Sequence, residues 1–140
     1  MIVYNSRLAK HFLQGKGKKC FITLLGVTYT TESGYIPMDV SLEMKIHRQQ
    51  YAECFWSSFI PVAILCTILT LVFEAYLSWI LVILPFLTYH ILYWIEYKAK
   101  GHSAFDYEAV LNHDDAAYPV MRRSFAWKKW YWKDHLRSIN

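Results

Sequence analysis

One apolar stretch, which runs from residue 55 to residue 97, dominates this sequence of 140 residues. Only Glu74 and Glu96 carry a formal charge in it, and Glu74 separates an uncharged piece of 19 residues, 55–73, from one of 21 residues, 75–95. A helix rises about 1.5 Å per residue, so each piece matches the roughly 20 residues that cross about 30 Å of hydrocarbon. The stretch predicts a transmembrane helical hairpin, with helices at about 55–73 and 76–95 and a turn over 74–78.

The alternative is a hairpin buried in a soluble protein. A chain of 140 residues leaves too little polypeptide to cover two apolar helices on every side, which favours the membrane. Aromatic residues gather toward the ends of the stretch, as they do at membrane interfaces. Pro61 and Pro85 each lack a backbone N–H, so we expect each to kink its helix.

The charges outside the stretch predict its orientation. Residues 1–54 and 98–140 each have a net charge of +3, whereas 55–97 contain no Lys or Arg. Because positive loops remain on the cytoplasmic side, both termini are predicted to be cytoplasmic. No nucleic-acid-binding motif accompanies the basic flanks, so the lipid bilayer, and not a nucleic acid, is the expected partner. The three cysteines lack C-x-x-C spacing and predict no disulfide framework.

We therefore expect a single α+β membrane domain over residues 1–140. Its predicted parts are an N-terminal β segment, a helix carrying polar motifs, the membrane hairpin and a cytoplasmic, membrane-proximal helical tail, at 1–38, 39–54, 55–97 and 98–140 respectively.

Local composition refines these parts. The β-branched and aromatic run over 20–31 predicts one or two strands broken near Gly26, and 1–13 predicts a short strand or a surface helix. Residues 14–19 (QGKGKK) predict a basic turn. Asp39 or Ser41 is expected to cap the motif helix. A further helix is expected over 103–118, followed by an aromatic and basic tail, 119–140, that suits either a membrane surface or a simple aromatic anchor.

Ligand-type side chains cluster on the motif helix. Glu43, His47, Gln50 and Cys54 follow at i, i+4, i+7 and i+11, which places them on one helical face. Side chains at i and i+4 can bind one metal ion, although the same spacing is common in ordinary surface charge pairs.

Several segments together support a family resemblance. YNSRLAKHFL, FITLLGVTYT, SLEMKIHRQQYAE, YHILYWIEY, FDYEAVLNHDDAAY and RRSFAW occur in this order. The pattern resembles small bacterial membrane proteins of a zincin-like metallopeptidase type, which combine strands, an H-E-x-[IL]-H helix followed by Q-Q and E, an apolar segment, an F-E-x-E-A-Y-x-N element and R-x-x-F-A-W. The resemblance implies a multi-pass protein of the cytoplasmic (inner) membrane.

The resemblance assigns roles to individual residues. His47 matches the second motif histidine and Glu108 the third metal ligand or its neighbour, while Glu43 replaces the first histidine. The matching positions for supporting groups are Gln50, Glu53, Asp106 and Asn112. The catalytic glutamate is replaced by Met44 in the degenerate motif Glu43-Met44-Lys45-Ile46-His47, and a thioether cannot accept the proton of a metal-bound water.

Three functions stay open. In the first, the chain is a degenerate, non-proteolytic relative that binds a protein or peptide, with or without a metal ion in its zincin-like frame. Alternatively it is a metallohydrolase that holds zinc, manganese or iron through Glu43, His47 and Glu108, with Glu53 or Asp106 as the base. The third is a membrane anchor or assembly subunit without a site.

Two ionisable groups in the second apolar piece need separate expectations. His90 is expected to serve packing, hydrogen bonding or the site, because an ionisable group within a span is a functional candidate. Glu96 is expected to be solvated near the interface.

Overall fold

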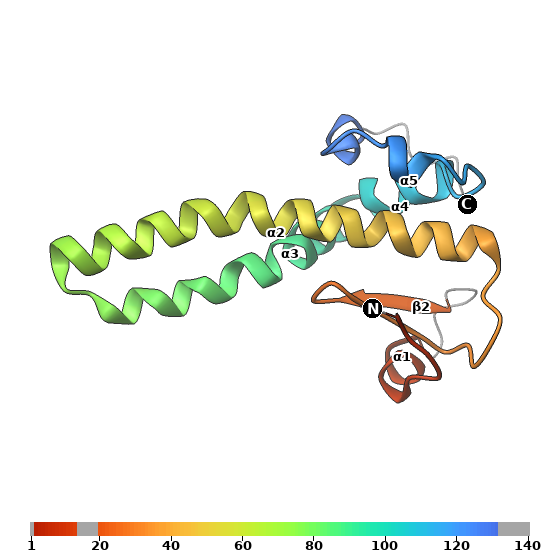
Figure 1. Ribbon diagram of the computed structural model, residues 1–140, viewed down its shortest axis with the longest axis horizontal. Helices are drawn as coiled ribbons and strands as arrows, with labels where there is room; N and C mark the ends of the chain where they lie inside the picture. The colour runs from red at the N-terminus through yellow and green to blue at the C-terminus, as the bar shows by residue number, and fades with distance from the viewer. Residues whose placement is uncertain (1, 14–19, 132–140) are drawn as a thin grey trace.

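The computed structural model describes residues 2–13 and 20–131, and it consists of a long helical hairpin with a head of shorter elements at one end (Figure 1). The predicted basic turn at 14–19 and the last nine residues of the tail lie outside this description. We use "the head" for the described residues on either side of 55–91.

A small sheet forms the N-terminal part of the head. Strands β1 (Ile2–Val3), β2 (Phe21–Leu24) and β3 (Val27–Thr30) lie in the order β1-β3-β2, with β1 parallel and β2 antiparallel to β3. Helix α1 (Arg7–Leu13) follows β1, so the first residues form both a strand and a helix. The predicted break at Gly26 is confirmed.

The turn between β2 and β3 requires its glycine. Gly26 has a φ of +76°, and a Cβ there would lie 3.1 Å from the Tyr51 ring. The left-handed conformation and this close approach both favour glycine. The turn therefore packs directly on the long helix.

Helix α2 (Met38–Phe73) runs without interruption for 36 residues, or about 54 Å. It joins the predicted motif helix to the predicted first span. The expected cap from Asp39 or Ser41 is wrong, because the helix begins after Pro37, whose carbonyl accepts the N–H of Ser41 (3.0 Å). Pro61 lies inside the helix.

The return arm begins as a different kind of helix. Glu74, with a φ of +53°, ends α2, and a 3₁₀-helix, η1 (Tyr76–Ile83), leads into α3 (Leu84–Lys100). Pro85 lies in the first turn of α3, where its missing N–H costs no intrahelical hydrogen bond. Pro85 lies where the arm changes from 3₁₀-helix to α-helix, and the kink expected there stays a prediction.

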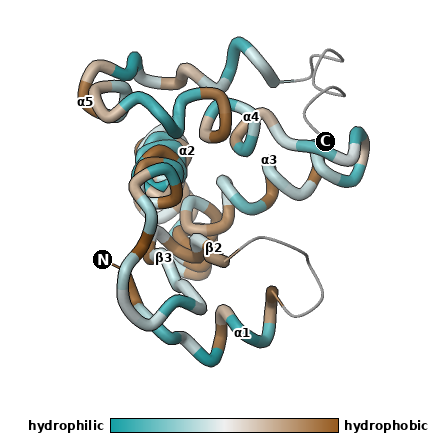
Figure 2. Tube along the Cα trace, turned by 90° about the vertical axis from the view of Figure 1, so that its right-hand side faces the viewer, coloured by the Kyte–Doolittle hydropathy of each residue, from teal (hydrophilic) through white to brown (hydrophobic). Residues whose placement is uncertain are grey.

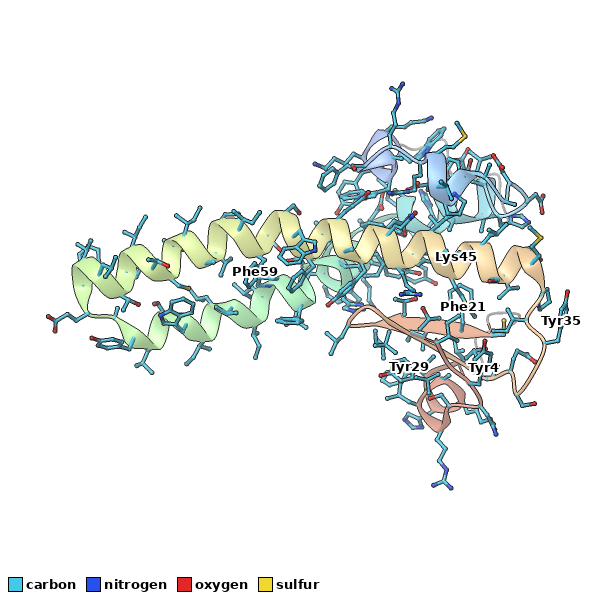
Figure 3. The ribbon with its side chains drawn as sticks, in the orientation of Figure 1. Tyr4, Phe21, Tyr29, Tyr35, Lys45 and Phe59 are labelled. Carbon is cyan, nitrogen blue, oxygen red and sulfur yellow. The ribbon has the colours of Figure 1, made fainter. Side chains whose placement is uncertain are left out.

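Both arms are long and apolar enough to cross a membrane, and the rest of the described chain leaves them uncovered. Only 6% and 11% of their most apolar 18-residue windows are buried. Leu71 and Leu77 near the turn are 78% and 81% exposed. Figure 3 shows the largely hydrocarbon side chains of the arms projecting outward.

The C-terminal part of the head is a series of short helices. They are α4 (Ala104–Leu111), α5 (Tyr118–Met121) and the 3₁₀-helix η2 (Ala126–Lys129). The helix predicted over 103–118 is thus shorter, because Ser103 caps α4 and the chain leaves it at Asn112. Figures 1 and 2 place α4 and α5 on one side of α2 and the sheet with α1 on the other.

Aromatic residues from these segments pack together in the head. The cluster consists of Tyr51, Cys54, Tyr89, Phe105 and Trp127. Trp127 is 5% exposed, so this part of the predicted surface tail is instead core.

Candidate functional site

Polar side chains of α2 meet those of α4 and α5 inside the head. The hairpin returns the chain to the side that it left, and α4 then packs beside residues 47–53 of α2. Ser103 caps α4 by accepting the N–H of Phe105 (3.2 Å), and the Glu96 carboxylate accepts that of Ala104 (2.8 Å). Glu96 is fully buried, so the expectation that it is solvated is wrong.

One arginine lies between two glutamates at this junction. Arg122 donates from Nε to Glu108 Oε1 (2.5 Å), from Nη2 to Glu108 Oε2 (3.1 Å) and Glu53 Oε2 (3.2 Å), and from Nη1 to Glu53 Oε1. The side chains of Arg122, Glu53 and Glu108 are 3%, 14% and 0% exposed. We call these three residues the Arg122 clasp, since they bind segment 118–127 to α2.

Two further side chains donate hydrogen bonds to these carboxylates. Tyr118 donates to Glu108 Oε1 (2.9 Å), and Trp127 Nε1 donates to Glu53 Oε2 (3.1 Å). Burial and the hydrogen bond to Glu108 raise the pKa of Tyr118 to about 12. Burial alone would lower the pKa of Arg122, but the hydrogen bonds and charges of Glu108 and Glu53 outweigh it and raise that pKa above its ordinary value.

The polar network continues inward through Gln50, which is fully buried. Gln50 Nε2 donates to Glu108 Oε2 (3.0 Å) and to the Phe105 carbonyl (3.1 Å), so Oε1 is the atom that lies 3.0 Å from His47 Nδ1. An amide oxygen only accepts, so we assign the proton of His47 to Nδ1. The Tyr89 hydroxyl lies 3.0 Å from the same nitrogen.

The other ring nitrogen of His47 faces two carboxylates. His47 Nε2 lies 3.6 Å from Asp106 Oδ1 and 3.9 Å from Glu43 Oε1, and Tyr93 donates to Asp106 Oδ2 (2.7 Å). A hydrogen-bonded chain therefore runs from Arg122 through Glu108 and Gln50 to His47. Its polar groups bind one another.

The predicted ligands Glu43, His47 and Glu108 do not share one centre. Glu43 and Glu108 approach His47 from different sides, because Gln50 separates Glu108 from the imidazole. Both oxygens of Glu108 already accept hydrogen bonds from the clasp. Within 2–13 and 20–131, no group of three His, Cys, Asp or Glu side chains is arranged to hold a metal ion. The residues present thus do not fit a zinc, manganese or iron site.

The remaining predicted residues have local roles. Glu53, a candidate base, is held by Arg122 and Trp127, while Asp106, the other candidate, faces His47. Asn112 Nδ2 donates to the Glu108 carbonyl (2.7 Å) at the end of α4. His90 lies apart from the clasp, and its Nε2 accepts the N–H of Leu25 (3.3 Å) in the sheet turn.

Sequence reasoning did not place five residues in this polar network: Arg122, Tyr118, Trp127, Tyr89 and Tyr93. Arg122 and Trp127 are the first and last residues of the RRSFAW segment, and that segment was the available signal. Glu53 and Glu108, whose side chains are 14% and 0% exposed, require a cation or donors, and this segment supplies both.

Comparison of the chain with protein-family models, with curated protein sequences and with solved structures found no match. The zincin-like resemblance therefore remains a hypothesis that depends on the sequence segments alone.

Proposed function

We propose that this chain is a two-span membrane protein whose head is a binding module without peptidase activity. Two exposed apolar arms support the membrane assignment, since water would contact nearly all of their side chains otherwise. Both flanks of the hairpin are basic, which supports a head on the cytoplasmic side of a cytoplasmic membrane.

The lengths of the two arms agree with one bilayer. Nineteen α-helical residues, 55–73, span about 28 Å. On the return arm η1 contributes about 16 Å at about 2 Å per residue, and the next eight residues of α3 bring the total to about 28 Å at residue 91. The second span then ends near Ile91 and not near Ile95, and His90 comes to lie at the interface, where it meets Leu25 of the head.

The Arg122 clasp is the main support for the proposal that the chain has no peptidase activity. A metallopeptidase needs a free carboxylate to activate water and an open coordination position. Here Glu53 and Glu108 accept hydrogen bonds from Arg122, and Met44, at the position of the family's catalytic glutamate, is fully buried. The polar residues therefore hold the head together.

A binding role is supported by apolar side chains on the outside of the head. Val120 and Met121 on α5 are 88% and 80% exposed, and the clasp residue Arg122 follows them directly. Exposed adjacent apolar residues on a rigidly held helix suit contact with a protein or peptide partner.

The first experiment measures metal content and proteolysis. Detergent-purified wild type and His47→Ala are compared for zinc, manganese and iron per chain and for cleavage of an unfolded protein substrate. We expect neither stoichiometric metal nor cleavage in either protein. Stoichiometric metal or cleavage that His47→Ala abolishes would overturn the proposal in favour of the metallohydrolase.

The binding role is tested by photocrosslinking in native membranes. A photoreactive residue at position 121 is expected to yield a discrete adduct, and Val120→Glu is expected to remove it. The matched control carries the photoreactive residue at Tyr35, which is 85% exposed in the loop before α2. No adduct at position 121, or the same adduct at both positions, would leave a membrane anchor without a binding surface.

A further inference from the structure

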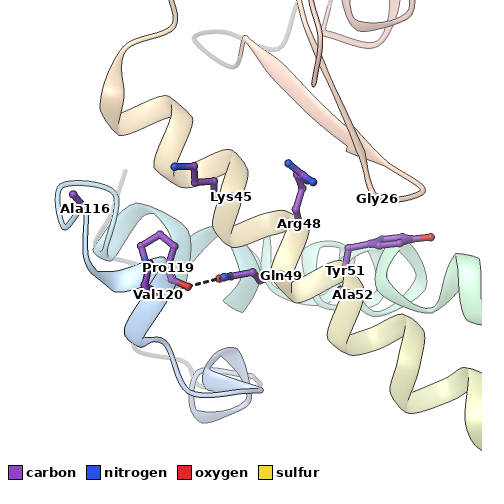
Figure 4. Close-up of a pocket in the computed structure, with 9 residues that line it drawn as sticks. All are labelled: Gly26, Lys45, Arg48, Gln49, Tyr51, Ala52, Ala116, Pro119 and Val120. Carbon is purple, nitrogen blue, oxygen red and sulfur yellow. Dashed lines mark hydrogen bonds between the residues drawn. The ribbon is translucent and has the colours of Figure 1, made fainter. Parts of the chain in front are cut away.

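A pocket of about 510 Å³ lies across α2, between the β2–β3 turn and α5 (Figure 4). Its volume is within the range of small-molecule sites. Gln49 forms part of the wall and donates to the Pro119 carbonyl (2.6 Å), which fixes α5 against α2. Gly26 lines the opposite side. The walls of the pocket thus belong to elements that are packed against α2.

Two cations line this pocket. Lys45 and Arg48 are exposed, lie at i and i+3, and project from the same side of α2 in Figure 4. Neither forms an ion pair or hydrogen bond with any other residue in the described part of the chain, and none of its acidic residues lines the pocket. The pocket therefore holds uncompensated positive charge. In contrast, Lys128 and Lys129 lie over aromatic rings of their own segment.

The position of the pocket along α2 indicates the source of an anion. The pocket extends from Lys45 to Ala52, and Ala52 precedes the apolar arm at Phe55 by three residues, about 4.5 Å. Lipid headgroups occupy a layer of about 5–7 Å outside the hydrocarbon. The near end of the pocket is thus level with the headgroups, and the long Arg48 side chain can reach them from about 10 Å above Phe55.

We propose that this pocket binds the phosphate of an anionic membrane phospholipid, a proposal that rests on the membrane insertion proposed above. Arg48 presents a planar fork that suits two phosphate oxygens, and Lys45 adds a second charge. The two uncompensated cations select against a zwitterionic headgroup, because its ammonium group would be repelled. The bound lipid would fix the depth of the head at the membrane surface.

The test titrates the detergent-purified full chain with dioleoyl phosphatidylglycerol or dioleoyl phosphatidylcholine and counts bound lipid by native mass spectrometry. The variant is Lys45→Gln with Arg48→Gln. The matched control is Arg7→Gln with Arg123→Gln, which removes two exposed cations of the head outside the pocket. A third measurement adds inorganic phosphate as a competitor.

We expect one phosphatidylglycerol to bind in preference to phosphatidylcholine. The pocket variant should bind it about 30-fold more weakly, because each lost cation costs about 1 kcal/mol of binding free energy and every 1.4 kcal/mol corresponds to a tenfold change in affinity. The control should bind within about threefold of wild type. Equal weakening in both double variants, or no preference between the lipids, would overturn the proposal. Displacement of the lipid by millimolar inorganic phosphate would assign the pocket to a free anion instead.

Extraction of native membranes with alkaline carbonate separates this proposal from the membrane proposal. A chain released by carbonate refutes membrane insertion and the lipid site together. A chain retained in the membrane, but without a lipid preference, refutes the lipid site alone. Since Lys45 and Arg48 are exposed, the pocket variant should unfold within a few degrees of wild type.

Discussion

Removal of the cation from the Arg122 clasp should be the most destabilising single polar change in the head. Arg122→Met keeps much of the side-chain volume but removes four hydrogen bonds to Glu53 and Glu108. It also leaves two carboxylates, 14% and 0% exposed, without their positive charge. Removal of one partner from a buried group of charges lowers the free energy of unfolding by about 3–5 kcal/mol.

The corresponding change in melting temperature follows from the size of the head, because the proposed spans would stay in the bilayer. For the roughly 90 described residues of the head, an unfolding entropy of about 2.1 cal/mol/K per residue gives about 0.2 kcal/mol/K, so the loss corresponds to a decrease of roughly 15–25 °C. Intrinsic tryptophan fluorescence of protein in lipid nanodiscs measures it. Arg123→Met, which removes the exposed neighbouring cation, is the control and should change the free energy of unfolding by at most about 0.5 kcal/mol.

A triple variant separates the unpaired charges from the lost contacts. Combining Arg122→Met with Glu53→Gln and Glu108→Gln replaces the two buried carboxylates by neutral amides of similar shape. We expect it to recover at least half of the loss, because much of the cost comes from buried charge without a partner. A melting temperature of Arg122→Met within about 3 °C of wild type would refute the clasp as a stabilising element.

Substitutions at three further positions test the packing of the head. Gln50→Leu replaces a fully buried amide and removes its hydrogen bonds to Glu108 and to the Phe105 carbonyl, so it should lower the free energy of unfolding by about 2–4 kcal/mol in denaturant titration. Gln50→Glu should lower it further, because it places a second buried carboxylate beside Glu108. The raised pKa of Tyr118 means that the folded state keeps a proton that the unfolded state loses; stability should therefore fall between about pH 10 and pH 12, and Tyr118→Phe should flatten that decline. Glu96→Ala leaves the Ala104 N–H at the start of α4 without its acceptor, and hydrogen exchange at α4 should accelerate more than at the sheet.

The helical hairpin and the small sheet could be predicted because their signals are local. An apolar run interrupted only at Glu74 specifies two helices, and β-branched residues around Gly26 specify two strands. The conformation of η1 was not predictable from composition, because its residues are as apolar as those of an α-helical span. Its effect on the proposed span is large, since a rise of about 2 Å per residue would place the end of that span several residues earlier.

The polar interior was harder to predict because it depends on long-range packing. The spacing of Glu43, His47 and Gln50 predicted a shared helical face, but it could not show that Gln50 would lie between His47 and Glu108. That arrangement depends on where α4 packs, 55 or more residues later in the chain. Charge balance alone would have suggested a cation for the buried acids, without identifying Arg122.

Because α2 is continuous, a tilt of its apolar arm also moves the head. Residues 38–54 extend about 25 Å beyond the apolar arm on the same continuous helix. A change in tilt of about 10° within the bilayer, well inside the range that membrane helices adopt, would swing the far end of the head by roughly 4 Å. Bilayer thickness could thereby set the angle at which the head meets whatever binds it.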